Sequence, residues 1–427
     1  MRKTLLIVFL CKVFLANAQD TLVLSLTQVI DLNKKQNLTI KENNIKYNLA
    51  KASFYSSIGK AIPSFGMGIK RYELSGFTQS TEGDFIDVDK DQEWIGKSFQ
   101  LSWDLRELFF NSVSAKQKSK AAFYSKNAKN EDENIRIYTL YFMLVSSYEK
   151  EKAINNFISK NTEIVKQLQL QVAAGLRLES ELLLAQTNLN NLKIKLLEQQ
   201  QRTVVYNQEL LAAIDIDENI IIKTEFNLFD NYSFNISFAN IEEVLYNRFE
   251  LQQLKKELSA AAWQKNKQLY GLLIPKITFG MNDGLIGPIN QNAFGDQNIL
   301  SSSLMWNIPL GKVFPSGDFK YQRSLYQIKK IEKERLENQL RAELKIIITA
   351  YKSADEQYKL AKESAQFAKT AYKQSLQRQQ LGTANQLELF HAEKEYLNAQ
   401  LIHINSIVKR LDTGHKQMAA INNKVLH

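Results

Sequence analysis

The feature that most constrains the fold of this chain is a short pattern that occurs twice. Gly175 is followed by a Glu six residues later and by an Ala ten residues later, and Gly382 repeats the pattern 207 residues further on. Each glycine stands between two long polar segments of helical character. The repeated pattern therefore indicates an internal duplication of a helical hairpin.

The composition favours long, uninterrupted elements. The chain has 427 residues, enough for two or three ordinary domains, but only five prolines and sixteen glycines. Its formal net charge is +10. Lys and Glu are interspersed without a basic block, which indicates solvated helix faces and no nucleic-acid partner.

The N-terminus has the pattern of a secretory leader. Arg2 and Lys3 precede an apolar run at 5–10, and Ala16-Asn17-Ala18 provides a small-residue cleavage site. We therefore predict a signal peptide over residues 1–18.

The only cysteine, Cys11, lies inside this leader. Leu10 precedes it where lipoprotein processing requires a small residue, so a lipid anchor is not expected. A chain without the leader would have no disulfide and no thiolate chemistry. After the leader no run of 18 apolar residues occurs, so no membrane-spanning helix is predicted.

Both halves begin with an amphipathic helix that ends in Ile-Pro. The first is expected over 25–60 and stops before Pro63, and the second over 240–272 and stops before Pro275. After each Ile-Pro the hydrophobic period changes from helical to two.

Four segments alternate apolar with small or polar residues and are predicted as strands, at about 63–72, 95–105, 275–283 and 299–309. Each is about 9–11 residues long, the length that a tilted strand needs to cross a bilayer. Outer-membrane barrels have this alternation, with aromatic residues near the strand ends. A soluble antiparallel sheet with one wet face would show it too. The candidate membrane-facing aromatics are Phe65, Trp103, Phe279 and Trp306.

Loops are expected between the paired strands. Residues 73–94 are rich in Asp and Glu, and we interpret them as a solvated extracellular loop. The segment from Asp87 to Asp91 matches only the start of a calcium-binding loop, because the Gly that should follow and the Glu that should close the loop are missing. Residues 283–298 form the matching loop, with three Gly and one Pro.

Long helices follow in each half. From Ile137, a mostly apolar stripe with steps of three and four residues extends to Val172 and resumes from Leu178 to Ala213. In the second half the same spacing joins Phe390 to Met418 with interruptions, among them Lys394. The first helix of each hairpin is expected to run for about 60 residues, or about 90 Å, so the helices must pack lengthwise on one another.

These elements divide the chain into two repeats, 19–213 and 240–427, each with its hairpin tip, at 175 and at 382. Residues 214–239 join them, and their short apolar stretches indicate one or two strands or an extended linker.

Four strands cannot close a membrane barrel, because single-chain barrels start at about eight strands. An open sheet edge cannot face lipid, because its backbone groups would stay unpaired. If the strands lie in a membrane, several chains must share one barrel, as in a cyclic homo-oligomer.

The whole chain after the leader resembles the TolC-type outer-membrane efflux proteins. The resemblance rests on the duplicated order of helix, Ile-Pro, strand, loop, strand, long helix, tip and long helix. It rests equally on the repeated tips, which end at Ala185 and Ala392, and on the similar offsets of Pro63/Pro275 and Trp103/Trp306.

The resemblance implies an α+β membrane protein of the outer membrane. Three copies would form a twelve-stranded β-barrel above a twelve-helix periplasmic α-barrel. The function implied is a passive exit duct of a tripartite efflux or type I secretion system. Its partners would be a periplasmic adaptor, an inner-membrane pump of RND or ABC type, and outer-membrane lipid.

In that family the hairpin tips form the periplasmic entrance and receive the adaptor. The resemblance therefore assigns docking to Gly175, Leu176 and Arg177 in the first tip and to Gly382 and Thr383 in the second. Both glycines would let the chain reverse, which is also what an ordinary helix C-cap does.

The entrance and gate candidates are Glu181, Glu388 and His391. Copies of Glu388 around a threefold axis would form an acidic ring that attracts cations. A solvated Glu at a helix start is the plainer alternative. His391 stands where some family members have a second acid, which would make the entrance less acidic and pH-responsive. The contacts that keep the entrance closed in some family members would differ in this chain, because Gln379 and Ala384 stand where those members have a Tyr and an Arg.

No enzyme activity, cofactor or metal site is expected. The sequence contains no nucleophile elbow, phosphate loop or Cys/His cluster, and its four His, spaced by twelve residues, do not share a helix face. The alternative function is a secreted or surface coiled-coil scaffold or adhesin without channel activity. That alternative would not need two pairs of alternating strands.

Overall fold

The computed structural model describes residues 21–62, 64–217, 219–229, 234, 241–288, 294–306, 308, 317–381, 383 and 386–422. The expected leader at 1–18, Pro63, Gly382 and Ala384 lie outside these residues, as does most of 230–240. The chain divides into two compact units. One comprises 1–44, 126–248 and 338–427, and the other 45–125 and 249–337.

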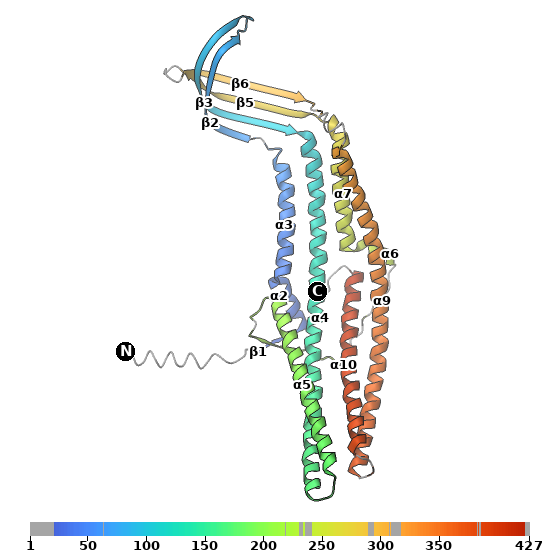
Figure 1. Ribbon diagram of the computed structural model, residues 1–427. Coiled ribbons are helices and arrows are strands. Elements are labelled where there is room, and N and C mark those ends of the chain that lie inside the picture. Colours follow the sequence, from blue (N-terminus) through green and yellow to red (C-terminus); the bar gives the residue numbers. More distant parts are fainter. Residues whose placement is uncertain are drawn as a thin grey trace, which may run out of the picture. The chain divides into compact units, whose positions relative to one another are not determined.

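The first unit contains both hairpin tips. Helix α4 (Leu105–Ala173) turns into α5 (Glu179–Ile214), and α9 (Gly317–Gln380) turns into α10 (Gln386–Asn422), so that the two arms of each hairpin lie side by side (Figure 1). The helices α4 and α9 have 69 and 64 residues, which agrees with the length expected from the sequence. None of the described helices is both long enough and apolar enough to cross a membrane.

The predicted seam of the first hairpin is confirmed. Ile137, Leu144, Asn161 and Leu168 of α4 are almost completely buried, and Ala185 of α5 is completely buried. These side chains pack because positions three and four apart share one face of a helix.

A second core in this unit lies around a small parallel sheet. Strand β1 (Thr21–Leu24) pairs with β4 (Ile221–Thr224), so the segment that joins the repeats contributes one strand. Asn207 of α5 fixes β4, because its side chain accepts from Ile222 N at 2.8 Å and donates to Ile220 O at 2.9 Å. Tyr141 of α4 donates to Leu24 O at 3.1 Å.

The helix expected over 25–60 is interrupted. It forms α2 (Leu26–Gln36) and α3 (Leu38–Gly59), with Asn37 in extended conformation between them. The buried Asn37 side chain accepts from Ile40 N at 3.1 Å, so it caps the second helix in place of continuing the first. The second repeat is also split, into α6 (Ile241–Asn247) and α7 (Phe249–Leu269), followed by η1 (Tyr270–Leu273).

The second unit contains a four-stranded antiparallel sheet in the order β2-β3-β5-β6 (Figure 1). Its strands are β2 (Ser64–Gln79), β3 (Phe85–Asp104), β5 (Lys276–Pro288) and β6 (Gly295–Met305). The four segments with period two thus form strands, as predicted, and each predicted pair lies side by side in the sheet.

The interpretation of 73–94 as a loop is wrong. These residues continue β2 and β3 in register from Glu73↔Asp91 to Gln79↔Phe85, and the connection shrinks to a turn around Gly83. The acidic side chains within the two strands, Glu73, Asp87, Asp89, Asp91 and Glu93, all lie on one face, while the other face carries neutral and basic residues. Glu82 and Asp84 lie in the turn. Alternation, and not total polarity, decides that a strand forms here.

The loop expected over 283–298 is also shorter, because β5 continues to Pro288 and β6 begins at Gly295.

The register divides the sheet into two faces. Cross-strand partners gather most of the large apolar side chains on one, here called the apolar face: Phe65, Met67, Ile69, Ile95, Phe99, Leu101, Trp103, Ile277, Phe279, Met281, Leu285, Leu300 and Leu304. Small and polar side chains predominate on the other, here called the polar face: Ser64, Gly66, Gly68, Gly96, Ser98, Gln100, Ser102, Thr278, Gly280, Asn282, Gly284, Ser301 and Ser303. The large apolar side chains of Trp94, Ile286, Ile299 and Met305 also lie on this face. Ser302, opposite Phe279, interrupts the apolar face as the sequence indicated.

Candidate functional site

The first hairpin tip is a tight helix C-cap centred on Gly175. Gly175 has φ +69°, its N–H donates to Val172 O at 3.0 Å, and the N–H of Leu176 donates to Gln171 O at 2.8 Å. These two bonds form a Schellman motif, in which glycine is favoured because the left-handed conformation strains other residues. The predicted role of Gly175 as the reversal point therefore has a direct structural basis.

The side chains of this tip combine exposed leucines with an ion pair. Leu176 and Leu178 are 74% and 69% exposed. Arg177 Nη1 lies 3.4 Å from Glu181 Oε2, and Glu181 stands in the first turn of α5, where the helix dipole favours an acid. The tip thus offers apolar contact area beside a compensated charge.

The second tip is built in a similar way. The N–H of Thr383 donates to Arg378 O at 2.9 Å, and the Thr383 hydroxyl donates to the same oxygen at 3.1 Å. Leu381 and Leu387 are 78% and 64% exposed. Gln379, one of the positions that departs from the family, donates to Gln386 Oε1 at 3.2 Å, so the closing residues of this tip bond within the chain.

Glu388 is engaged by an arginine that the sequence did not single out. Arg378 Nη1 lies 2.7 Å from Glu388 Oε1, and both side chains are partly exposed. Each of the two candidate gate carboxylates therefore faces an Arg of its own chain, Arg177 in one tip and Arg378 in the other. His391, one turn beyond Glu388, is exposed.

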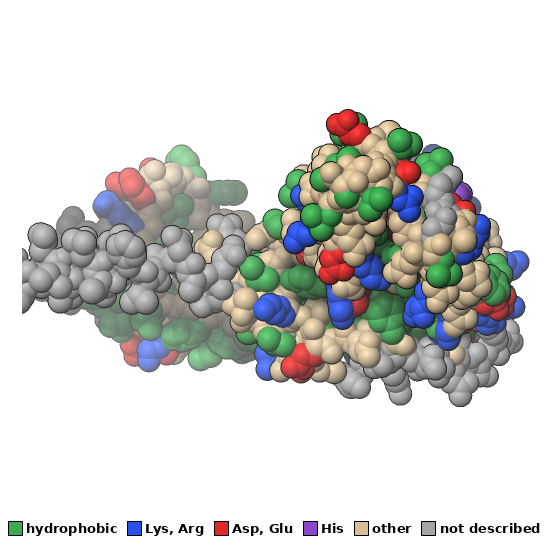
Figure 2. Space-filling model, turned by 90° about the horizontal axis from the view of Figure 1, so that it is seen from below, with side chains coloured by type: hydrophobic (Ala, Val, Ile, Leu, Met, Phe, Trp, Pro, Cys, Tyr) green, Lys and Arg blue, Asp and Glu red, His purple; other side chains and the backbone are tan. Residues whose placement is uncertain are grey.

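Viewed from below, the end of the molecule that carries the tips shows hydrophobic side chains interspersed with acidic and basic ones (Figure 2). Such a surface suits a partner with mixed apolar and polar contacts.

Glu393 is the residue of this region that sequence reasoning missed. It is 2% exposed on α10, where it accepts hydrogen bonds from Asn161 of α4 and from Asn188 of α5, the latter at 3.3 Å. Asn188 also donates to Asn161 Oδ1 at 3.0 Å. One carboxyl group thus joins both arms of the first hairpin to the second hairpin.

Burial raises the pKa of the Glu393 carboxyl to about 7, although the bonds from the two Asn and the charge of Lys160 act in the opposite direction. A buried carboxylate costs free energy, so the proton stays on to higher pH.

The sequence did contain a signal for it. The buried face predicted from Phe390, with Lys394 as an interruption, is displaced by one residue at its start. Leu389 is fully buried, whereas Phe390 is only partly buried and Lys394 is exposed. Moving the stripe by one position would have placed a Glu in the core.

The strand aromatics occupy equivalent places in the two repeats. Trp103 Nε1 donates to Ala61 O at 2.6 Å and Trp306 Nε1 donates to Leu273 O at 3.3 Å, so each indole ties a strand end to the carbonyl two residues before the repeated proline. Phe65 lies opposite Phe99, and the ring of Phe279 meets that of Phe99 edge to face at 6.4 Å. An apolar body with one bonded polar atom is what membrane-interface aromatics require.

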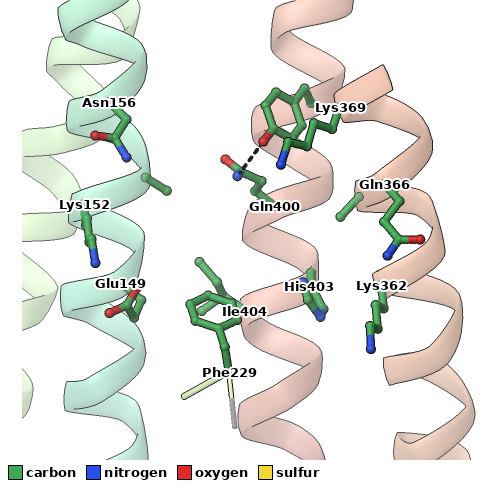
Figure 3. A pocket seen from close by; sticks show the side chains of 13 residues that line it. Glu149, Lys152, Asn156, Phe229, Lys362, Gln366, Lys369, Gln400, His403 and Ile404 are labelled. Atoms are coloured by element: carbon green, nitrogen blue, oxygen red, sulfur yellow. Dashed lines mark hydrogen bonds between the residues drawn. The ribbon is translucent and has the colours of Figure 1, made fainter. Parts of the chain in front are cut away.

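A groove of about 380 Å³ lies in the first unit between α4, α9 and α10. Figure 3 shows side chains of all three helices directed toward it, with Gln400 donating to the Tyr396 hydroxyl at 3.0 Å. Its charged side chains are Glu149, Lys152, Lys362 and Lys369. The excess of lysine favours anionic over cationic groups there.

The histidines lie apart. His391 is exposed, His403 stacks near Tyr358, His415 stacks on Tyr138 at 4.4 Å, and His427 is outside the described residues. Among the residues that the structure describes, no group of three or more His, Cys, Asp and Glu could hold a metal ion.

A scan of protein-family models finds no match, and a search of curated proteins finds none either. Solved structures do match over nearly the whole chain. The CmeC outer membrane channel of Campylobacter jejuni shares 18% identity, with 93% of this chain and 85% of that chain covered and a TM-score of 0.77.

Two further structures are similar. The outer membrane protein VceC of Vibrio cholerae shares 16% identity, with 93% and 95% coverage and a TM-score of 0.75. A membrane protein from Pseudomonas aeruginosa shares 12% identity, with 93% coverage of both chains and a TM-score of 0.82. At these identities the likeness shows the fold, and the chain accordingly has the fold of the TolC-type outer-membrane channel proteins.

Proposed function

We propose that this protein is the outer-membrane exit duct of a tripartite efflux or type I secretion system. In this proposal three copies close a twelve-stranded barrel, and their hairpins form a periplasmic tunnel that docks an adaptor and, through it, an inner-membrane pump. The protein conducts passively and catalyses no reaction.

The observation that carries the proposal is the two-faced sheet with two open edges. The apolar face is exposed in the single chain, with Phe65 at 62%, Met67 at 75% and Leu300 at 71%. A lipid contact would cover it, because lipid-facing barrel strands alternate apolar and polar side chains in this way.

The edges support the same conclusion. Strands β2 and β6 are the outer strands of the sheet, and along the chain the four strands alternate in direction. The β6 edge of one copy can therefore pair antiparallel with the β2 edge of the next. In lipid this pairing is required, because unpaired backbone groups are costly there.

Exposed apolar residues on the helices of the second unit also favour assembly. Ile45 and Leu49 of α3 are 66% and 70% exposed, and Ile328 and Ile331 of α9 are 50% and 58% exposed. Neighbouring copies would cover these stripes as helices of an oligomer do.

The second candidate function, a secreted coiled-coil scaffold or adhesin, is favoured by the seams of the hairpins alone. It gives no account of the apolar face of the sheet.

Planar-bilayer recording of the purified protein tests the proposal. Stepwise conductance is expected from the unmodified chain. Leu101→Arg, on the apolar face, should reduce insertion, because an Arg facing lipid near mid-membrane costs about 2–4 kcal/mol. Ser102→Arg, one residue later on the polar face, should insert normally and change the conductance.

Absence of conductance from correctly folded protein would overturn the duct and leave the scaffold. Equal insertion of both arginine variants would contradict the assignment of the two faces, and so would stable insertion after deletion of residues 65–105.

A further inference from the structure

The extended part of the β2–β3 hairpin, residues 70–79 and 85–94, separates its charges by face. Cross-strand pairing places Lys70 opposite Trp94 and Leu74 opposite Lys90, all on the continuation of the polar face. The ten positions of that face contain these two lysines and no carboxylate. Arg71 and the acids lie on the continuation of the apolar face: Glu73, Asp87, Asp89, Asp91 and Glu93.

Trp94 forms a rigid base for one of the lysines. Its side chain is 3% exposed and covers the paired glycines Gly96 and Gly284. A Cβ on Gly96 would come within 2.6 Å of the indole and would clash with Asp283 O, and a Cβ on Gly284 would come within 2.8 Å of the indole. Only glycine leaves room for the ring at both places.

Lys70 lies over this ring, with Nζ 5.3 Å from its centroid. That distance is within the range of a cation–π contact, which orients the ammonium group without neutralising it. No carboxylate pairs with Lys70 or Lys90 among the described residues. The remainder of the polar face is uncharged as far as the strand ends, where Asp104 lies opposite Lys276.

We propose that Lys70, based on Trp94, and Lys90 form a cationic ring in the outer mouth of the duct and draw polyanionic molecules there. The proposal rests on the proposed function, because it requires several copies to share a barrel with the polar face inside. Rings of lysine or arginine make pores favour anions. The acids on the opposite face of the same strands, Asp89 and Asp91 beside Lys90 among them, point away from the passage.

Inorganic triphosphate is the probe that tests this ring. It is added in turn to each side of a planar bilayer that contains the purified full-length protein, in about 0.1 M KCl, where the screening length is about 10 Å. Block is expected from one side only. The double variant Lys70→Gln/Lys90→Gln should raise the half-blocking concentration about tenfold or more, because charged clefts concentrate counter-ions by at least that factor.

Two matched variants separate position from charge. Lys70→Arg should keep the block, because it keeps the charge. Lys97→Gln removes a lysine of the same hairpin that lies on the apolar face, opposite Asp283, and should also leave the block unchanged. In 1 M KCl, where the screening length is about 3 Å, the block should disappear.

Unchanged block in the double variant, equal loss in Lys97→Gln, or block that survives 1 M KCl, each with normal conductance, would overturn the ring and leave the duct standing. A protein that forms no conducting channel at all would instead overturn the proposed function.

Discussion

Glu393 is an ionisable side chain in the middle of a helical core, and its proton links stability to pH. Its pKa is raised to about 7, so the folded chain holds the proton over a range in which the unfolded chain, near 4.5, has lost it. The contribution of Glu393 to stability should therefore fall as pH rises from about 4.5 to 7, by about 3 kcal/mol in total at 1.36 kcal/mol per pKa unit.

Thermal melting of the helical signal between pH 5 and 8 checks this. Burial lowers the pKa of His415 to about 4, so this group makes stability rise with pH over part of the same range. The melting temperature of the wild type relative to that of Glu393→Gln should nevertheless fall from pH 5 to 8, because the amide still accepts from Asn161 and carries no charge. Glu395→Gln, exposed on the same helix, is the control and should keep the wild-type dependence. The same pH dependence in Glu393→Gln would refute the assignment. Two other titratable groups, Lys160 and Tyr372, interact electrostatically with Glu393.

At the second tip, Arg378 and Glu388 should have opposite effects on block by multivalent cations. Arg378→Gln removes this ion pair from the carboxylate and should strengthen block from the periplasmic side several-fold, whereas Glu388→Ala should weaken it. Dose–response recordings in bilayers measure both. If neither variant changes conductance or block, no acidic ring exists at this position.

Among the elements, α10 offers the sharpest test of which face is buried. Leu389 is completely buried against Ile154, Phe157 and Leu192, so Leu389→Ala should cost about 2–5 kcal/mol. Leu387, two residues earlier, is 64% exposed, and Leu387→Ala should stay within about 0.5 kcal/mol. Denaturation curves of the two variants in detergent decide the matter. Similar losses would mean that the helix is rotated.

Periodicity was enough to predict most of the elements. The steps of three and four from Ile137 and the alternation around Phe65 and Trp103 each reflect one face that must be buried or covered, so they are visible in a single sequence. The reversal at Gly175 was visible because a repeated glycine between helices has few other uses.

The rest depends on contacts that a linear pattern does not contain. Asn37 divides a helix because its side chain caps the next one, and polarity at 73–94 concealed strands whose acids all lie on one face. The roles of Arg378 and Glu393 could not be predicted, because they depend on partners that only the fold brings together. Arg378 pairs with Glu388, ten residues away. Glu393 is bonded by Asn161 and Asn188 on two other helices.

At the scale of the whole molecule, β2 and β6 are the outer strands of the sheet, and the backbone groups on their outer edges have no strand to pair with in the described part of a single chain. The two edges are separated by β3 and β5, about 14 Å at 4.8 Å per strand, which is too far for a disulfide within one chain. A bond between cysteines placed on these two edges therefore reports contact between copies. The chain itself contributes only Cys11, in the expected leader.

The most direct measurement combines Ser303→Cys in β6 with Ser64→Cys, Gly66→Cys or Gly68→Cys in β2, all on the polar face, followed by oxidation and denaturing electrophoresis. We predict covalent species of two and three chains, and none larger, for at least one pair. Met67→Cys, on the apolar face of β2, should not link to Ser303→Cys. Monomers alone from every polar-face pair, linked species larger than three chains, or equal linking through Met67→Cys would contradict a barrel closed by three copies.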